Sequence, residues 1–180
     1  MKRVVSFIIV LSFLVSSFGL AQNKFVGAKT CAPCHKTGKQ GKQDSIWVKS
    51  KHAGAYKTLT TETAQKIAKE KGLKKAANES PECLECHVTA PKGDAKLLDK
   101  GYNKAEGISC ESCHGAGSAY KTMAIMKDAK KAVEAGLTEF KDEKAIEAYC
   151  VTCHNEKSPT YIEFKFKEAW AQIAHPLPKK

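Results

Sequence analysis

The sequence predicts a mostly α-helical fold with little or no sheet, in which helices and loops wrap around groups that the chain binds covalently. Three observations support this prediction. No stretch long enough for a sheet alternates between apolar and polar residues. The apolar residues beyond the N-terminus are thinly spread, so the chain supplies little core of its own. A five-residue pattern, Cys-x-x-Cys-His, occurs four times.

Cys-x-x-Cys-His is the attachment signature of c-type haem. The two thiols add across the vinyl groups of one porphyrin, and the adjacent imidazole ligates its iron. One helical turn places both sulfurs on the same side of the ring, with the histidine directed at its centre. We therefore expect four covalent haems, whose rings provide the buried apolar surface. The proximal residues are Cys31, Cys34 and His35; Cys83, Cys86 and His87; Cys110, Cys113 and His114; and Cys150, Cys153 and His154.

Zinc and disulfides are the alternative interpretations of these cysteines. Two Cys-x-x-Cys pairs could make one tetrahedral zinc site, and eight cysteines could form four bridges. Neither alternative explains the histidines. Since histidine is 6 of 180 residues, a chance histidine in the same place four times has a probability of about one in a million.

The N-terminus has the pattern of an export signal. Lys2 and Arg3 precede an apolar run from Val4 to Phe18, and the small-residue stretch 19–21 resembles a cleavage site. Cleavage after Ala21 would leave residues 22–180 as one tetrahaem domain outside the cytoplasm, in the periplasm, where c-type haem is attached. The alternative is an uncleaved N-terminal membrane anchor, although the run is short for a span of roughly 20 residues.

The formal charge is +11, and every basic residue except Arg3 is lysine. Nucleic-acid recognition relies on the bidentate fork of arginine, so this composition argues against nucleic acid as a partner. Lysines around a haem edge would instead steer an acidic redox partner. A plainly solvated lysine surface is the alternative.

The first predicted helix covers residues 44–59. Val48, His52, Tyr56 and Leu59 recur at spacings of three and four and give it one apolar face. A histidine on such a face is usually a core residue, but here the core is haem. We therefore expect His52 to be a distal iron ligand.

Further helices follow in order, each with its own signal. An amphipathic helix is expected over residues 61–77, and Ser80 with Pro81 begins the helix that carries the second motif. Residues 88–107 are expected to form a loop. Gly115 and Gly117 would let the backbone approach a porphyrin, or form a helix C-cap. The remaining signals are a helix over 123–135, a cap at Asp142, and an aromatic amphipathic segment over 161–174 that places His175 as a second distal ligand.

In this order the residues resemble the cytochrome c-554 family of tetrahaem proteins, in which the protein accepts electrons from hydroxylamine oxidoreductase in ammonia oxidisers. The resemblance runs through most of the chain after the signal. Besides the haem motifs it comprises Trp47, Ser50, His52, Ala53, Ala55 and Leu59, the stretch from Gly107 to Gly115, and Phe164-Lys165-Phe166 leading to Ala174-His175.

The resemblance implies a helical fold with haems in stacked pairs, three bis-histidine haems and one haem open on its distal side. By position, it implies that His52 caps the haem of Cys110 and Cys113, and that His175 caps the haem of Cys150 and Cys153. The haem of Cys83 and Cys86 would be the open one, able to bind nitric oxide or another small nitrogen oxide.

The chain departs from the family at Thr122, where the family has its remaining distal histidine. Met123 and, one turn further, Met126 lie beside it. Either a methionine, with Met123 preferred to Met126, takes the sixth position of the first haem, or that haem is open as well. Methionine pairs at helical spacing also serve as core filler.

These patterns favour an electron carrier in which the iron of four c-type haems changes oxidation state. No carboxylate pair or nucleophile–base arrangement predicts catalysis by side chains. The alternatives are an enzyme that reduces a small nitrogen compound at an open haem, and a subunit of a cytochrome filament. All four motifs end in histidine, whereas multihaem nitrite reductases typically have a Cys-x-x-Cys-Lys site.

Overall fold

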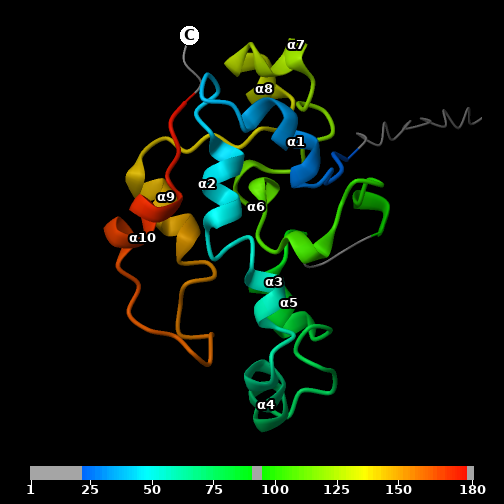
Figure 1. Cartoon of the computed structure of the whole chain (residues 1–180), viewed down its shortest axis with the longest axis vertical. Coiled ribbons are helices and arrows are strands. Elements are labelled where there is room, and N and C mark those ends of the chain that lie inside the picture. Colours follow the sequence, from blue (N-terminus) through cyan, green and yellow to red (C-terminus); the bar gives the residue numbers. More distant parts are fainter. Residues whose placement is uncertain (1–21, 91–94, 178–180) are drawn as a thin grey trace, which may run out of the picture.

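The computed structural model of the chain describes residues 22–90 and 95–177, which form short helices joined by loops (Figure 1). These residues contain no strand, only an isolated parallel bridge between Phe25 and Leu98. The predicted, mostly helical fold is confirmed. The helices are α1 (Ala28–His35), α2 (Gln43–Lys49), α3 (Ala55–Thr58), α4 (Glu62–Glu70), α5 (Pro81–His87), α6 (Cys110–His114), α7 (Met123–Met126), α8 (Ala129–Glu134), α9 (Glu143–Cys150) and α10 (Phe166–Ile173), with 3₁₀ turns η1 (Ala95–Leu97) and η2 (Lys104–Glu106).

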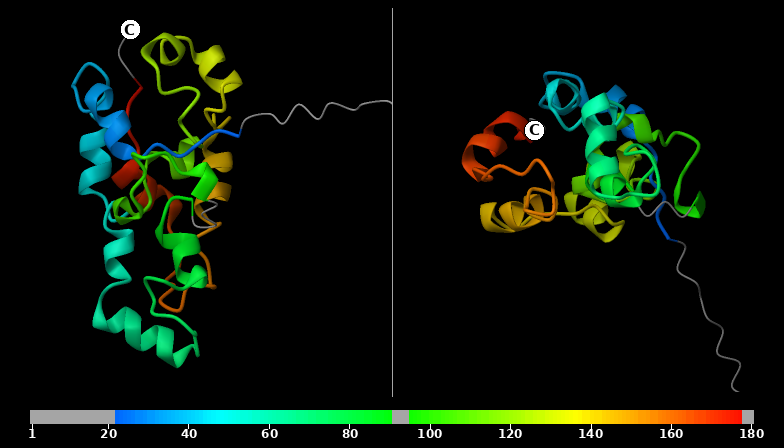
Figure 2. Two further views of the ribbon diagram at one scale, coloured as in Figure 1. Left: turned by 90° about the vertical axis from the view of Figure 1, so that its right-hand side faces the viewer. Right: turned by 90° about the horizontal axis from the view of Figure 1, so that it is seen from below.

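The molecule is elongated, with α4 at one end and the α7–α8 pair at the other (Figure 1). Helices α1, α2 and α6 lie between these ends, and α10 packs against α2. Figure 2 shows the same separation of α4 from α7 and α8 in a second view. The predicted export signal lies outside the described residues, and none of the described helices is long and apolar enough to cross a membrane.

Helices α3, α4 and α5 form the end that carries the second motif. Leu59, Ala68 and Ala77 are buried there, and the side chains of Ala64, Leu73, Cys83 and Leu84 pack against them. Thr61 caps α4 by accepting a hydrogen bond from the Ala64 amide at 3.3 Å. The helix ends at Glu70, earlier than predicted, because Gly72 takes a positive φ of 68° and turns the chain.

Two predicted helices are each divided into two shorter ones. The helix expected over 44–59 ends at Ser50, whose backbone is extended and whose hydroxyl donates to the Trp47 carbonyl at 2.7 Å. The helix expected over 123–135 is broken at Asp128, whose carboxylate instead caps α8 by accepting from the Lys131 amide at 3.1 Å. In both places a short polar side chain bonds to nearby backbone and competes with helix continuation.

Other predicted helix signals are confirmed. Ser80 and Pro81 begin α5, and the Asp142 carboxylate caps α9 by accepting from the Ala145 amide at 2.8 Å. The aromatic segment 161–174 is helical only from Phe166, and its last residues deliver His175 just beyond α10.

The buried residues are few, and most are small or polar. The hydrophobic ones among the described residues are Val26, Ala28, Leu59, Ala68, Ala77, Val88, Tyr120, Ala132 and Phe166. Such a core is small for a chain of this length. A small polypeptide core agrees with the prediction that covalently bound haem rings supply most of the buried apolar surface.

Candidate haem-binding site

The structure places each Cys-x-x-Cys-His motif on a helix or at its end. The first three motifs lie within α1, α5 and α6. The fourth begins at Cys150, the last residue of α9, and continues the helical turn because the His154 amide donates to the Cys150 carbonyl at 3.0 Å. All eight cysteines are free, and the described residues contain no cluster of three or more ligands suited to a bare metal ion.

The cysteines of different motifs meet in pairs. The Cys31 thiol donates to the Gly27 carbonyl at 3.9 Å. The two thiols Cys31 and Cys110 lie close enough to perturb each other, since the presence of Cys110 raises the pKa of Cys31 and the presence of Cys31 lowers the pKa of Cys110. Burial and the neighbouring Cys153 together raise the pKa of Cys86 to about 11. The first motif therefore lies beside the third, and the second beside the fourth.

Two pairs of imidazole rings lie close together at nearly the same separation, with their planes tilted by 56° and 45°. The centroids of His52 and His154 are 6.0 Å apart, and those of His114 and His175 are 5.9 Å apart. Because imidazole–metal bonds are about 2 Å long, two imidazoles that bind one metal ion from opposite sides have centroids roughly 6 Å apart. The spacing of both pairs fits an iron between them.

The neighbours of the two spare histidines differ from those that the resemblance implied, and the ligand assignment stays a prediction. His52 was expected opposite the third motif, and its ring lies beside that of His154 of the fourth. His175 was expected opposite the fourth motif, and its ring lies beside that of His114 of the third. His52 stands in the turn between α2 and α3. The Ile108 amide holds this turn by donating to the His52 carbonyl at 3.0 Å.

All four paired imidazoles are in environments that favour the neutral form. Burial lowers the pKa of His52, and the neighbouring His154 lowers it further. Burial also lowers the pKa values of His154, His114 and His175. A neutral imidazole has the free lone pair that a metal requires. The buried Nδ1 of His114 has no hydrogen-bond partner among the described residues.

Hydrogen bonding and stacking orient two other motif histidines. The Nδ1 of His87 lies 2.8 Å from the Ala55 carbonyl, so Nδ1–H donates and Nε2 is left with its lone pair. The ring of Phe164 stacks on His154 with centroids 4.6 Å apart. Neither contact was expected from the sequence. The chain has six histidines, and both that lie outside the motifs are beside His114 and His154. His35 lies near the His114–His175 pair and lowers the pKa values of both, after burial as the main cause.

The third motif connects the segments that carry the other motifs. Glu111 within it accepts hydrogen bonds from the backbone before α1. Ser112 contacts the Thr89 hydroxyl at 2.8 Å, just after the second motif, and its carbonyl accepts from the Tyr149 hydroxyl beside the fourth. Sequence reasoning missed Glu111, Thr89 and Tyr149 because their partners are distant in the chain.

The glycines after the third motif have ordinary structural roles in the described structure. Gly115 is the C-cap of α6, with a φ of 79° that favours glycine. Gly117 approaches protein rather than open space, since a Cβ there would lie 3.0 Å from the Glu111 Oε1 atom. The C-cap alternative is therefore the one that the contacts favour for Gly115.

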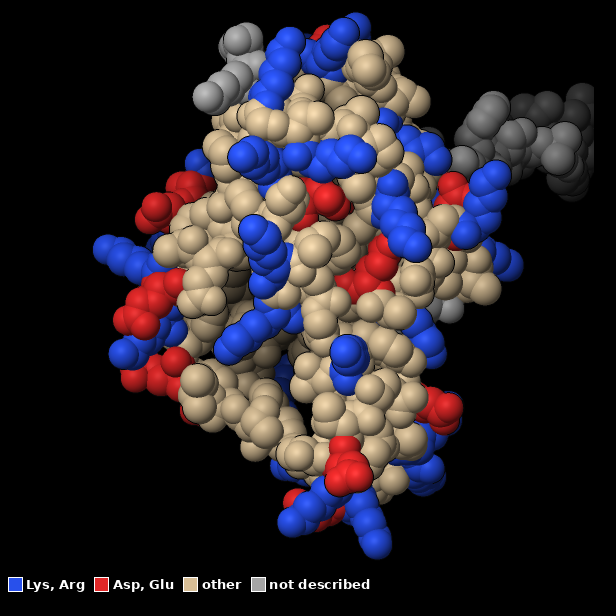
Figure 3. All heavy atoms as spheres, in the orientation of Figure 1, with Lys and Arg blue, Asp and Glu red and all other residues tan. Residues whose placement is uncertain are grey.

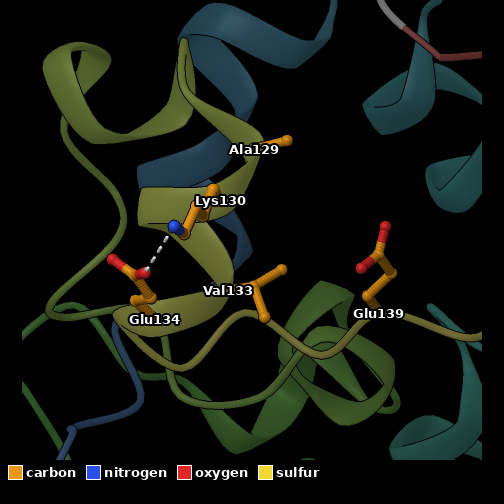
Figure 4. A pocket seen from close by; sticks show the side chains of 5 residues that line it. All are labelled: Ala129, Lys130, Val133, Glu134 and Glu139. Carbon is orange, nitrogen blue, oxygen red and sulfur yellow. Dashed lines mark ion pairs between the residues drawn. The ribbon is translucent and has the colours of Figure 1, made fainter.

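A pocket of about 470 Å³ lies beside α8 and is lined by Ala129, Lys130, Val133, Glu134 and Glu139. Figure 4 shows Ala129 and Val133 on the side of α8 toward Glu139, and Lys130 paired with Glu134 at 3.9 Å farther from Glu139. No cysteine, histidine or methionine lines this pocket, so it contributes no iron ligand.

A helical chain with a small core, free cysteine pairs on Cys-x-x-Cys-His helices and imidazoles spaced for iron defines a c-type cytochrome. The chain matches the family model described as cytochrome c554 and c-prime over residues 30–115, which include the first three motifs. Over that range it is similar to the cytochrome c-554 family that its sequence resembles. Proteins of this kind carry covalent haem c and exchange electrons with redox partners.

A relative supports the same conclusion. Cytochrome c-554 of Nitrosomonas europaea is 29% identical over 145 residues, which are 74% of this chain and 59% of that protein. The chain therefore spans less than two thirds of the length of this relative. No solved structure matches this chain.

Proposed function

We propose that the protein is an exported electron carrier with four c-type haems. The observation that supports it most directly is the pair of facing imidazoles, His52 with His154 and His114 with His175, each at the separation that one iron would require. Both pairs combine a motif histidine with a histidine from a remote part of the chain. Such pairs are expected if the fold supplies six-coordinate haems for electron transfer rather than open ones for catalysis.

The proposed proximal ligands are His35, His87, His114 and His154, and the thioether bonds are formed by the eight motif cysteines. We assign His175 to the iron of the third motif and His52 to the iron of the fourth. The first and second haems have no second histidine. Met123, at the start of α7, and Met126, half-buried at its end, are the candidates for the sixth position of the first haem.

The haems, when bound, supply the chemistry by cycling iron between its ferric and ferrous forms. The residues of the chain hold the rings in place and set their environment. Neutral imidazoles provide the ligands, and the hydrogen bond from His87 to the Ala55 carbonyl fixes the orientation of its ring. The proximity of Cys31 to Cys110 and of Cys86 to Cys153 supports haems that would lie next to one another in two pairs. Electrons can then pass within each pair.

Haem stoichiometry and spin state test this proposal in the wild-type protein. We expect a mass that corresponds to the cleaved chain with four haems, and paramagnetic resonance signals from two low-spin bis-histidine haems. The absorption spectrum of the ferric protein reports whether methionine is a sixth ligand of the first haem, because methionine bound to ferric iron gives its own charge-transfer band. Fewer than four haems, or four high-spin haems, would contradict the proposal.

A second candidate function is supported by the surroundings of His87. Because no second histidine faces His87, the second haem can bind a small ligand such as nitric oxide, and the protein would then act as an enzyme on a small nitrogen compound. Carbon monoxide added to the ferrous protein distinguishes the two functions. A spectral change confined to one haem would support an open second site, and no change would exclude it.

Six exposed lysines lie in residues 29–51, the part of the chain that holds Cys34, the one exposed cysteine among the eight. We name this surface the basic face; Figure 3 shows lysine side chains spread over the side of the molecule on which α1 and α2 lie. Asp44 is the only acidic residue in the same part of the chain, whereas residues 62–75 around α4 hold two glutamates and five lysines. The lysines are Lys29, Lys36, Lys39, Lys42, Lys49 and Lys51. We propose that an acidic redox partner docks on the basic face.

Neutralising the basic face should slow oxidation by an anion. We expect the Lys36→Gln, Lys39→Gln, Lys42→Gln triple variant to react several-fold more slowly with hexacyanoferrate(III) at low ionic strength, with the difference vanishing at high salt. Stopped-flow oxidation of the reduced protein measures this. The control triple variant changes Lys69, Lys71 and Lys74 near α4 and removes the same charge. Equal slowing of both variants would show that net charge alone matters and that the basic face is not a docking site.

A further inference from the structure

A buried carboxylate lies between the segments that carry the first and third motifs. Glu111 is the first variable residue of the third motif and is only 2% exposed. It is among the largest fully buried side chains of the described structure. Burying a carboxylate is costly unless it is hydrogen-bonded, so its contacts decide what it does there.

Backbone amides surround this carboxylate on both sides. Its Oε1 atom accepts from the Val26 amide at 2.8 Å and from the Gly117 amide at 2.7 Å. Its Oε2 atom accepts from the Gly27 amide at 2.8 Å and more weakly from Val26 at 3.0 Å. Gly27 is the N-cap of α1, the helix that carries the first motif. The carboxylate thus ties the third motif to the start of the first motif's helix.

The charge of Glu111 is not cancelled by a cation. Among the described residues, no lysine forms an ion pair with it, and its partners are amide dipoles at the N-terminus of α1. Its field reaches the surrounding groups. Burial and then the Glu111 charge raise the pKa of Tyr120, whose hydroxyl donates to the Gly115 carbonyl at 2.6 Å.

We propose that Glu111 is a positioning residue that sets the relative placement of the first and third haems and lowers their reduction potentials. The proposal rests on the proposed function, since it requires haems at Cys31–Cys34 and Cys110–Cys113. When a donor passes one electron to a ferric haem, the net positive charge of the haem falls by one. A fixed negative charge nearby stabilises the ferric form more than the ferrous form, because its attraction depends on that charge.

Two substitutions of Glu111 separate charge from packing. Glu111→Gln keeps the size but removes the charge, and its amide group can no longer accept at both atoms. Glu111→Asp keeps the charge with a shorter side chain. The matched control is Glu85→Gln. It removes the same charge from the second variable position of the second motif, where the side chain is exposed.

Spectroelectrochemical titration of the four-haem protein measures the effect. We expect Glu111→Gln to raise the potentials of two haems so that the ratio of reduced to oxidised haem increases at least tenfold, which is about 59 mV for one electron. Glu111→Asp should leave most of this ratio as it is in the wild type, and Glu85→Gln should leave the potentials of the first and third haems unchanged. An equal rise in Glu111→Gln and Glu85→Gln, or in Glu111→Gln and Glu111→Asp, would overturn the proposal.

Gly117→Ala provides a second route in case the neutral variant does not fold. A Cβ at this position would lie 3.0 Å from the Glu111 Oε1 atom and 3.2 Å from a Val26 methyl carbon, so it displaces the carboxylate without removing its charge. We expect altered resonance signals from the third haem with little change in potential; unaltered signals would contradict the positioning role. The haem count, measured separately by mass, shows whether a failure belongs to Glu111 or to the proposed function.

Discussion

Replacement of His52 by alanine should convert one haem from the low-spin to the high-spin state, and the affected haem should be the one held by Cys150 and Cys153. The reason is the 6.0 Å separation between the His52 and His154 centroids. Removal of the distal imidazole leaves a five-coordinate iron, whose weaker ligand field favours the high-spin form. Paramagnetic resonance and the near-infrared spectrum of the ferric protein measure the change.

The assignment of His52 to the fourth motif is tested by making the same substitution in a variant that lacks the fourth haem. In a Cys150→Ala, Cys153→Ala protein, which lacks the fourth haem, His52→Ala should add no new high-spin signal. If the signal appears there and disappears instead in a protein lacking the third haem, the pairing implied by the resemblance is right and ours is wrong. His175→Ala serves as the matched comparison. Its high-spin signal should be absent from a protein that lacks the third haem and present in one that lacks the fourth. Added imidazole should restore the low-spin state in both single variants.

Loss of the third haem should damage the whole molecule, whereas loss of the second should not. We expect Cys83→Ala, Cys86→Ala to yield a folded protein with one haem fewer. Cys110→Ala, Cys113→Ala should give several-fold less soluble holoprotein, because an abundance effect of this size follows from a modest loss of stability. Soluble yield and haem mass, measured for the two variants in parallel, test this expectation.

The difference follows from the contacts of the two segments. The second motif packs within its own small cluster with α3 and α4 at one end of the molecule. The third motif contacts the first through Glu111 and the segments of the second and fourth through Ser112. The bond to Glu111 is buried and the bond between Ser112 and Thr89 is half-buried, and an unsatisfied buried group left behind would cost about 1–3 kcal/mol. Comparable yields for the two variants would show that the third motif is not central.

The spare histidines also bear on the filament alternative. His52 and His175 both lie beside motif histidines of the same chain. Neither is therefore presented to the haem of a neighbouring molecule in the described structure. This favours a protein that completes its own third and fourth haem sites, as an electron carrier requires.

The sequence alone determined the class of protein, because the chemistry that defines it is local. Five consecutive residues carry both thiols and the proximal imidazole, and one helical turn suffices to align them. The helical composition, the small number of apolar residues and the helix starts at Ser80 and Asp142 can likewise be predicted from short stretches of sequence. His52 and His175 could be predicted as distal iron ligands because they are the only two histidines of the sequence outside the motifs.

Only the tertiary structure decided which imidazole lies beside which motif. His52 is 102 positions from His154, and no local pattern records that their rings lie side by side. Glu111, Thr89 and Tyr149 likewise look unremarkable in the sequence, since a carboxylate or hydroxyl gains its role from backbone groups that the fold brings to it. Ligand pairing and the central place of the third motif depend on contacts between distant segments, and those contacts exist only once the chain has folded.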